Sequence, residues 1–173
     1  MTKLIRLTLI AVILSVIASP GFAKSLTHTV KVSLRVLPIM ELEITGPAGG
    51  NIEFGDIQKD GTKNIITQAK DVIINAKTNM ATPYIIQQEL LTPISNAKGE
   101  VLTAGAMTVN ASNEAGRGQS MSNVSALTTP NIIYRSDARG RSDSIKAQYH
   151  VNIPPTQAAG SYESALRYTF VTA

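Results

Sequence analysis

The stretch LTHTVKVSLRVLPIMELEI, residues Leu26–Ile44, alternates polar and apolar residues from Thr29 to Val36 without a break. Because successive side chains of a β-strand point to opposite faces, this pattern predicts a strand with one apolar face. Pro38 removes one backbone donor and marks a bend or a sheet edge, after which IMELEI resumes the alternation. The apolar face needs a partner, either in the same domain or in a second molecule. Its residues are Val30, Val32, Leu34 and Val36.

Alternation with a period of two recurs along most of the remaining chain. About eight strands, with turn signals every 8–12 residues or so, predict an all-β fold, an immunoglobulin-like antiparallel β-sandwich with an N-terminal extension strand. The region 104–129, rich in Ser, Asn and Gly, reads either as a long polar loop or as weak edge strands with broad turns. The other predicted strands are NIEFGDI (51–57), DVIINAKT (71–78, buried on both faces), PYIIQQEL (83–90), NIIYRS (131–136), IKAQYHVNIP (145–154) and a final strand ending near Phe170.

The first residues have the layout of a secretory signal peptide. Lys3 and Arg6 precede an apolar run, and a Pro-Gly break followed by small residues leads to a cleavage site after Ala23. A run this short predicts a cleaved leader, with an N-terminal membrane anchor as the alternative. No later run is long enough to span a bilayer, so we expect no membrane span in the mature form. The expected organisation is a signal peptide (1–23), an N-terminal donor-strand extension (24–37) and a β-sandwich domain (38–173).

The composition argues against several classes of function. The chain of 173 residues has no Cys and a formal net charge of +4, which falls to +2 once Lys3 and Arg6 are removed with the leader. A charge this small is not that of a nucleic-acid binder, and the absence of Cys excludes disulfides, thiol catalysis and thiolate metal sites. His28 and His150, the only histidines, fall on polar strand faces, where solvent exposure is expected. We expect no enzymatic activity, cofactor, metal or nucleic-acid partner.

One charged turn is a candidate ligand-contact loop. YRSDARGRSDS, residues 134–144, brings Arg135, Arg139 and Arg141 close in sequence to Asp137. Such a loop could contact an anionic glycan or the carboxylates of a partner protein. The alternative is a solvated hairpin tip, which is the common fate of a run of mixed charges.

Three motifs, in this order along the chain, resemble those of secreted bacterial pilins. VKVSLRVLPIMELEI (30–44) is similar to the opening segment of such pilins, and NIEFGDI (51–57) resembles the Phe-Gly element of the spore-coat-U-like domain of chaperone–usher fimbriae. IPPTQAAGSYESALRYTFVT (153–172) is similar to their closing hairpin. The chain departs from the family pattern in having no Cys, and region 104–129 matches none of its motifs.

The resemblance implies a structural subunit of a pilus or surface fibre that polymerises by donor-strand complementation. Thr29–Val36 would complete the sandwich of the next copy, with the four apolar residues of its inner face forming the subunit interface. The implied partners are further copies of the chain, a periplasmic chaperone and an outer-membrane usher. The implied location is the periplasm in transit and then the cell surface or fimbrium. In the alternative, the same strand pairs within its own sandwich, and the protein is a monomeric exported binding module or adhesin for a glycan or protein.

Overall fold

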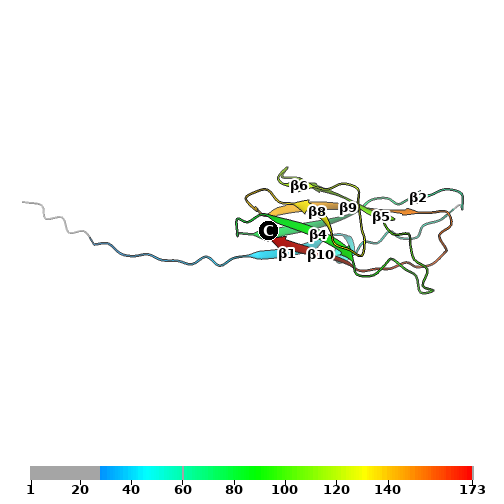
Figure 1. Cartoon of the computed structure of the whole chain (residues 1–173), viewed down its shortest axis with the longest axis horizontal. Coiled ribbons are helices and arrows are strands. Elements are labelled where there is room, and N and C mark those ends of the chain that lie inside the picture. Colours follow the sequence, from blue (N-terminus) through cyan, green and yellow to red (C-terminus); the bar gives the residue numbers. More distant parts are fainter. Residues whose placement is uncertain (1–27, 60, 173) are drawn as a thin grey trace, which may run out of the picture. The chain divides into compact units, whose positions relative to one another are not determined.

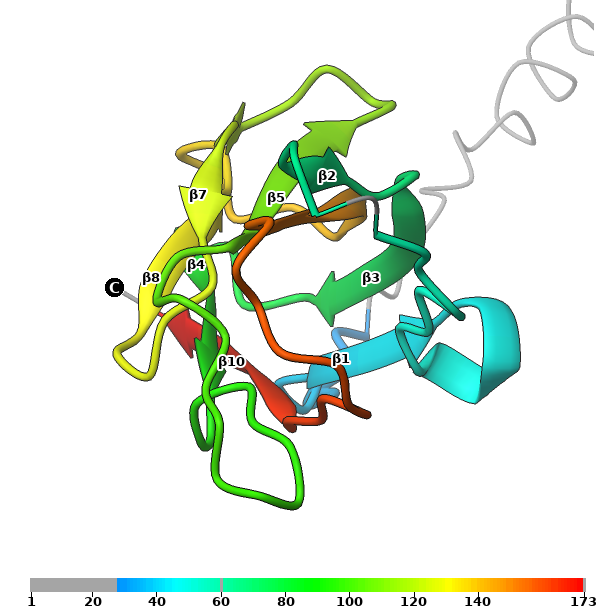
Figure 2. The same cartoon turned by 90° about the vertical axis from the view of Figure 1, so that its right-hand side faces the viewer.

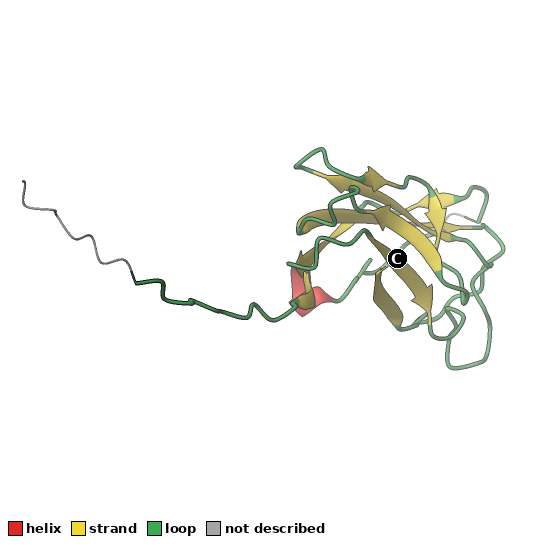
Figure 3. Ribbon diagram, turned by 60° about the vertical axis from the view of Figure 1, so that its left-hand side comes forward, coloured by secondary structure: helices red, strands yellow, loops and turns green. Residues whose placement is uncertain are grey.

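The computed structural model of the protein describes residues 28–59 and 61–172. The predicted signal peptide (1–23) lies outside the described residues. The described chain is all-β, with two antiparallel sheets that face each other (Figures 1 and 2). Within it, the one helical element is a short 3-10 turn, η1 (Pro47–Gly50), drawn red in Figure 3. The predicted all-β antiparallel sandwich is therefore confirmed.

The two sheets have different sizes and strand orders. The larger sheet has the order β1-β3-β9-β5-β7, with β2 paired to β9, and the smaller has the order β10-β4-β8-β6. Every strand pair is antiparallel. The strands are β1 (Met40–Thr45), β2 (Ile65–Ile66), β3 (Lys70–Thr78), β4 (Tyr84–Leu90), β5 (Met107–Asn113), β6 (Gln119–Ser120), β7 (Val124–Ser125), β8 (Asn131–Arg135), β9 (Asp143–Ile153) and β10 (Leu166–Thr172).

The core forms where the apolar sides of the alternating strands meet between the sheets. Strand β3 buries Val72, Ile74 and Ala76, while Ile73 between them is only half-buried on the outer face. The expectation that β3 is buried on both faces is therefore wrong, because no further layer of the described residues covers the outer side of this sheet. The fully buried core side chains from the other strands include Tyr84, Ile86, Val109, Ile133, Tyr134, Ile145 and Tyr149.

Two predicted segments differ from their expected form. Region 104–129 contains β5, a seven-residue strand between β9 and β7, together with the short strands β6 and β7. The strand alternative for this region was thus the better one, although β5 is a central strand and not an edge. NIEFGDI (51–57) forms no strand. Its Ile52 and Phe54 still pack against the core half-buried, as the alternation predicts.

One lateral side of the sandwich is joined by backbone hydrogen bonds between the sheets. The amide of Ala111 on β5 donates to the carbonyl of Met121 (2.8 Å), and the Met121 amide donates to the carbonyl of Ile133 on β8 (2.9 Å). A few residues later, Ala126 bonds Met107 of the larger sheet (2.8 Å). We call this the closed side, defined as β5, β6, β7, β8 and residues 121–127.

A buried network of polar side chains lies at one end of the closed side and links β8 to β9. The Tyr134 hydroxyl donates to Asp143 Oδ2 (2.5 Å), and Asp143 Oδ1 accepts from Arg117 Nη2 (2.9 Å). Burial, followed by the hydrogen bond to Asp143, raises the pKa of the Tyr134 phenol well above its usual value. Gly118 is required beside this network, because its φ is +67° and a Cβ would lie 2.4 Å from the Tyr134 hydroxyl oxygen.

Candidate functional site

The opposite lateral side of the sandwich has no such closure. Strand β1 pairs only with β3, and β10 pairs only with β4, so each ends its sheet with one unpaired edge. Figures 1 and 2 both show β1 beside β10. Among the described residues, no backbone hydrogen bond joins these two strands. We call β1 and β10 together the open side. Its free N–H and C=O groups are a template for pairing with a further strand.

The inward side chains of the open side are incompletely covered. Along β1 and β10 the inward positions are half-buried, whereas the inward positions of β4 next to β10 are buried. The alternation on β1 and β10 therefore points apolar groups toward the core, but solvent still reaches them. These half-buried residues that pack against the core are Leu42 and Ile44 on β1 and Leu166, Tyr168 and Phe170 on β10.

Tyr168 links the open side to a buried polar group. Its hydroxyl lies 2.8 Å from the hydroxyl of Tyr149, which in turn donates to Gln88 Oε1 (2.5 Å). Burial raises the pKa of Tyr168 to about 12, although the hydrogen bond with Tyr149 works in the opposite direction. Burial also raises the pKa of Tyr149 well above its usual value. Both phenols are thus neutral donors at ordinary pH.

Within the part of the chain that the structure describes, the predicted donor segment has no strand partner. Residues 28–39 carry no strand, and the chain divides into two units between Val36 and Leu37. The apolar face of Thr29–Val36 is open to solvent: Val30 is 79%, Val32 85%, Leu34 81% and Val36 72% exposed. Large exposed apolar faces are typical of interaction surfaces, so this segment is a candidate for one.

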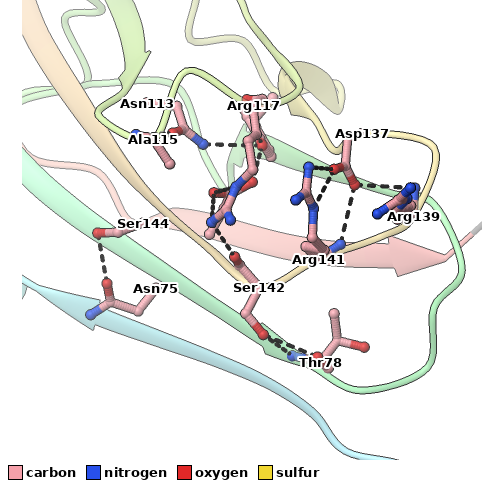
Figure 4. Close-up of polar contacts among 12 residues, drawn as sticks. Asn75, Thr78, Asn113, Ala115, Arg117, Asp137, Arg139, Arg141, Ser142 and Ser144 are labelled. Atoms are coloured by element: carbon pink, nitrogen blue, oxygen red, sulfur yellow. Dashed lines mark hydrogen bonds and ion pairs between the residues drawn. The ribbon is translucent and has the colours of Figure 1, made fainter.

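The candidate ligand-contact loop is tied together by its own charges. Asp137 Oδ1 accepts the backbone amides of Arg139 (3.1 Å) and Arg141 (3.3 Å), and Oδ2 accepts Arg141 Nε (2.7 Å), as Figure 4 shows. Burial works to raise the pKa of Asp137, but hydrogen bonds from the side chain and backbone of Arg141 outweigh it and lower that pKa. Within the described chain, the exposed guanidinium groups of Arg135 and Arg139 form no hydrogen bond or ion pair.

The described residues hold little that points to other chemistry. No group of three or more His, Asp or Glu residues among them could hold a metal ion. The His150 ring contacts the Thr67 carbonyl at 3.3 Å (Nδ1 to O). No helix within 28–59 or 61–172 is long and apolar enough to cross a bilayer. Comparison of the chain with protein-family models and with curated proteins finds no match.

The sequence predicted one of the two surfaces described above, the exposed apolar segment, but not the other, the open side. The segment Thr29–Val36 is visible as uninterrupted alternation. The half-buried residues of β1 and β10 alternate like those of any other strand, so only the strand order distinguishes them. No local signal in the sequence could have shown that these two strands lie at the unpaired edges.

Proposed function

We propose that this chain is a structural subunit of a pilus or surface fibre that polymerises by donor-strand complementation. Residues 29–36 of one copy lie between β1 and β10 of the next copy and pair with both free edges. One observation carries the proposal: the chain has an unpaired apolar segment and also a sandwich side whose inward residues lack a cover. Each copy thus supplies one half of a joint and accepts the other half.

Burial and backbone pairing both favour such a joint. Fully covering a Val or Leu side chain contributes about 1.5–3 kcal/mol, and Val30, Val32, Leu34 and Val36 are all available. The inserted strand also covers the half-buried residues of β1 and β10, so apolar area is removed from water on both partners. The edge amides and carbonyls of β1 and β10 that face no neighbouring strand gain a pairing partner.

The joint is head-to-tail, which determines the kind of assembly. The donated segment and the accepting side are different surfaces of the same chain, so each added copy leaves a new free accepting side. Heterologous contacts of this kind give open fibres unless a rotation closes them into a ring. A fibre subunit is therefore supported better than a symmetric dimer.

The proposal extends to export and to the handling of the free subunit. An immunoglobulin-like domain with an uncovered side is prone to unwanted edge pairing. A periplasmic chaperone that occupies the open side, and an outer-membrane usher that exchanges it for the next subunit, would prevent this. The final location is then the cell surface or fimbrium, reached after removal of the leader 1–23.

The test compares two aspartate substitutions at neighbouring positions of the donor segment. Leu34→Asp places a carboxylate where a buried apolar side chain is expected, whereas Ser33→Asp places the same charge on the opposite, outward face. Burying an unpaired charge is costly enough to abolish the joint. The measurement is the size ladder of exported protein on an unboiled denaturing gel.

We expect Ser33→Asp to keep the ladder of multimers and Leu34→Asp to lose it. Loss of the ladder in both variants would show that assembly is sensitive to any added charge in the segment, and would argue against a buried face that contains Leu34. An intact ladder in Leu34→Asp, or no ladder in the parent protein, would refute donation through this segment.

A further inference from the structure

The side chain of Asn79 bonds the backbone on both sides of Pro38. Its Nδ2 donates to the Leu37 carbonyl (2.9 Å), and its Oδ1 accepts the Ile39 amide (2.7 Å). The backbone amide of Asn79 also donates to the Ile39 carbonyl (3.4 Å). Since β1 and β3 pair with Met40 opposite Thr78, these bonds continue the same pairing beyond the ends of both strands. They hold residues 37–39 in line with β1.

The turn between β3 and β4, which contains Asn79, is held in place by the candidate ligand-contact loop (134–144). Thr78 donates its amide to Ser142 Oγ (2.8 Å) and accepts from the same hydroxyl at its carbonyl (3.0 Å), as drawn in Figure 4. Gly140 lies so close to Thr82 that a Cβ at Gly140 would be 1.9 Å from the Thr82 carbonyl oxygen. The candidate ligand-contact loop therefore supports the turn that holds Leu37–Ile39.

Strand direction shows what these bonds prevent. Met40 begins β1 opposite Thr78, and Thr172 ends β10 opposite Tyr84. Because residues 79–83 join β3 to β4 directly, β1 starts and β10 ends at the same end of the sandwich. To lie between its own β1 and β10, the extension must therefore reverse direction at Leu37–Ile39 and form a hairpin with β1.

The chain can form such a reversal once the hydrogen bonds from Asn79 to Leu37 and Ile39 are broken. Three residues, 37–39, separate Val36 from Met40, and three-residue hairpin loops are common. Pro38 is compatible with a turn, since proline is favoured at the second position of several turn types. The bonds from Asn79 to Leu37 and Ile39 require an extended course toward β3 and are incompatible with that turn.

We propose that Asn79 is a positioning residue that keeps the extension from completing its own domain, so that it remains available to a second copy. This inference rests on the proposed function, because it concerns the choice between the two possible occupants of the open side. When Asn79 is removed, the intramolecular hairpin competes at the high effective concentration of a tethered strand. Assembly then gives way to closed monomers.

The experiment uses introduced cysteine pairs in the full chain, which has no Cys of its own. One cysteine replaces Thr169 on the outward face of β10, and the other replaces Ser33, with Lys31 and Arg35 as alternative positions that cover neighbouring registers. Each pair is made with Asn79, Asn79→Ala and Asn79→Asp. After mild oxidation, non-reducing gels and mass spectrometry separate disulfides within one chain from disulfides between chains.

With Asn79 present we expect mainly intermolecular disulfides, in a ladder. Asn79→Ala should raise the ratio of intramolecular to intermolecular disulfides at least fivefold. Asn79→Asp should lie between them, because it keeps an acceptor for the Ile39 amide and loses the donor to Leu37. Asn75→Ala is the matched control, since Asn75 lies on β3 four residues before Asn79 but accepts from Ser144 (2.8 Å); this variant should keep the parent ratio.

The possible failures are distinguishable. An unchanged ratio in Asn79→Ala, with intermolecular disulfides still present, refutes the role of Asn79 and leaves the proposed function standing. A general loss of both kinds of disulfide shows that Asn79 only stabilises the fold, which also refutes the inference. If no pair forms intermolecular disulfides even with Asn79, the proposed function fails, and this inference fails with it.

Discussion

The two lateral sides of this sandwich are built differently. On the closed side, residues 121–127 bond both sheets, and Tyr134, Asp143 and Arg117 form a buried network at one end. On the open side, β1 and β10 each keep a free edge, and their inward residues stay half-buried. The same alternating pattern therefore gives buried inward side chains on the closed side and half-buried ones on the open side.

Under the proposed function, this difference separates the residues that stabilise the chain from those that serve its assembly. Buried hydrogen bonds and fully buried side chains on the closed side stabilise the single subunit. Residues of the open side contribute less to the single chain, because solvent reaches them, and the proposed joint would raise their contribution by covering them. Substitutions on the two sides should therefore affect different measurements.

The largest expected contrast is between Ile133→Ala and Leu166→Ala. Ile133 is fully buried on the closed side, so its truncation should lower the free energy of unfolding by about 2–5 kcal/mol. Leu166 is half-buried on β10, and its truncation should cost about 1 kcal/mol in a subunit that lacks residues 24–36. Urea unfolding measures both values.

A synthetic peptide of residues 29–36 sharpens this contrast. Capture of the peptide should weaken about tenfold in Leu166→Ala, equal to ~1.4 kcal/mol, and change little in Ile133→Ala where that variant is folded. Equal loss of peptide affinity in both variants would mean that the open side is not the accepting surface.

The buried network of the closed side should give the next largest effect. Asp143→Ala leaves the Arg117 guanidinium and the Tyr134 hydroxyl without their shared partner. The expected loss is about 3 kcal/mol, at the low end for a broken buried pair, because the Arg117 side chain keeps 34% exposure. Tyr134→Phe removes only the hydroxyl and should cost about 1–2 kcal/mol. A thermal melt that is unchanged in Asp143→Ala would contradict the role of this network.

A smaller effect is expected at alkaline pH on the open side. The pKa of Tyr168 is raised to about 12 by burial, so the folded state holds its phenolic proton more tightly than the unfolded chain, where the pKa is about 10. Its stabilising contribution is therefore complete below pH 10 and is lost as pH rises toward 12. Covering by a peptide should move the Tyr168 titration to still higher pH.

Ultraviolet difference spectra between the parent subunit and Tyr168→Phe isolate this phenol. A Tyr168 midpoint that does not move when the peptide is bound would show that the peptide does not cover β10. The comparison needs no other tyrosine to be assigned.

Much of the fold could be predicted from local sequence pattern. Strands β4 and β8 begin within one residue of their predicted positions, and Leu42 and Ile44 of β1 point inward as the alternation indicates. The apolar segment from Thr29 to Val36 was equally visible. In each case the signal is a repeat of period two among large apolar residues, which one short stretch contains in full.

The remaining features depend on contacts between distant residues. Strand β5 could not be assigned from its own residues alone, because only Met107, Val109 and Ala111 form its apolar inner face among small polar residues. Its position in the sheet depends on pairing with β9 and β7, which are distant in sequence or short. The open side is a property of strand order, which no single stretch encodes. Asn79 could not be recognised for the same reason, since its partners Leu37 and Ile39 lie forty or more residues away.

Amide hydrogen exchange on the subunit lacking residues 24–36, with and without the 29–36 peptide, tests the difference between the two sides most directly. Our account predicts that the peptide slows exchange at backbone amides of both β1 and β10, while the amides of β6 and β7 exchange at unchanged rates. Protection confined to β6 and β7, or no new protection at β1 and β10 with saturating peptide, would contradict it.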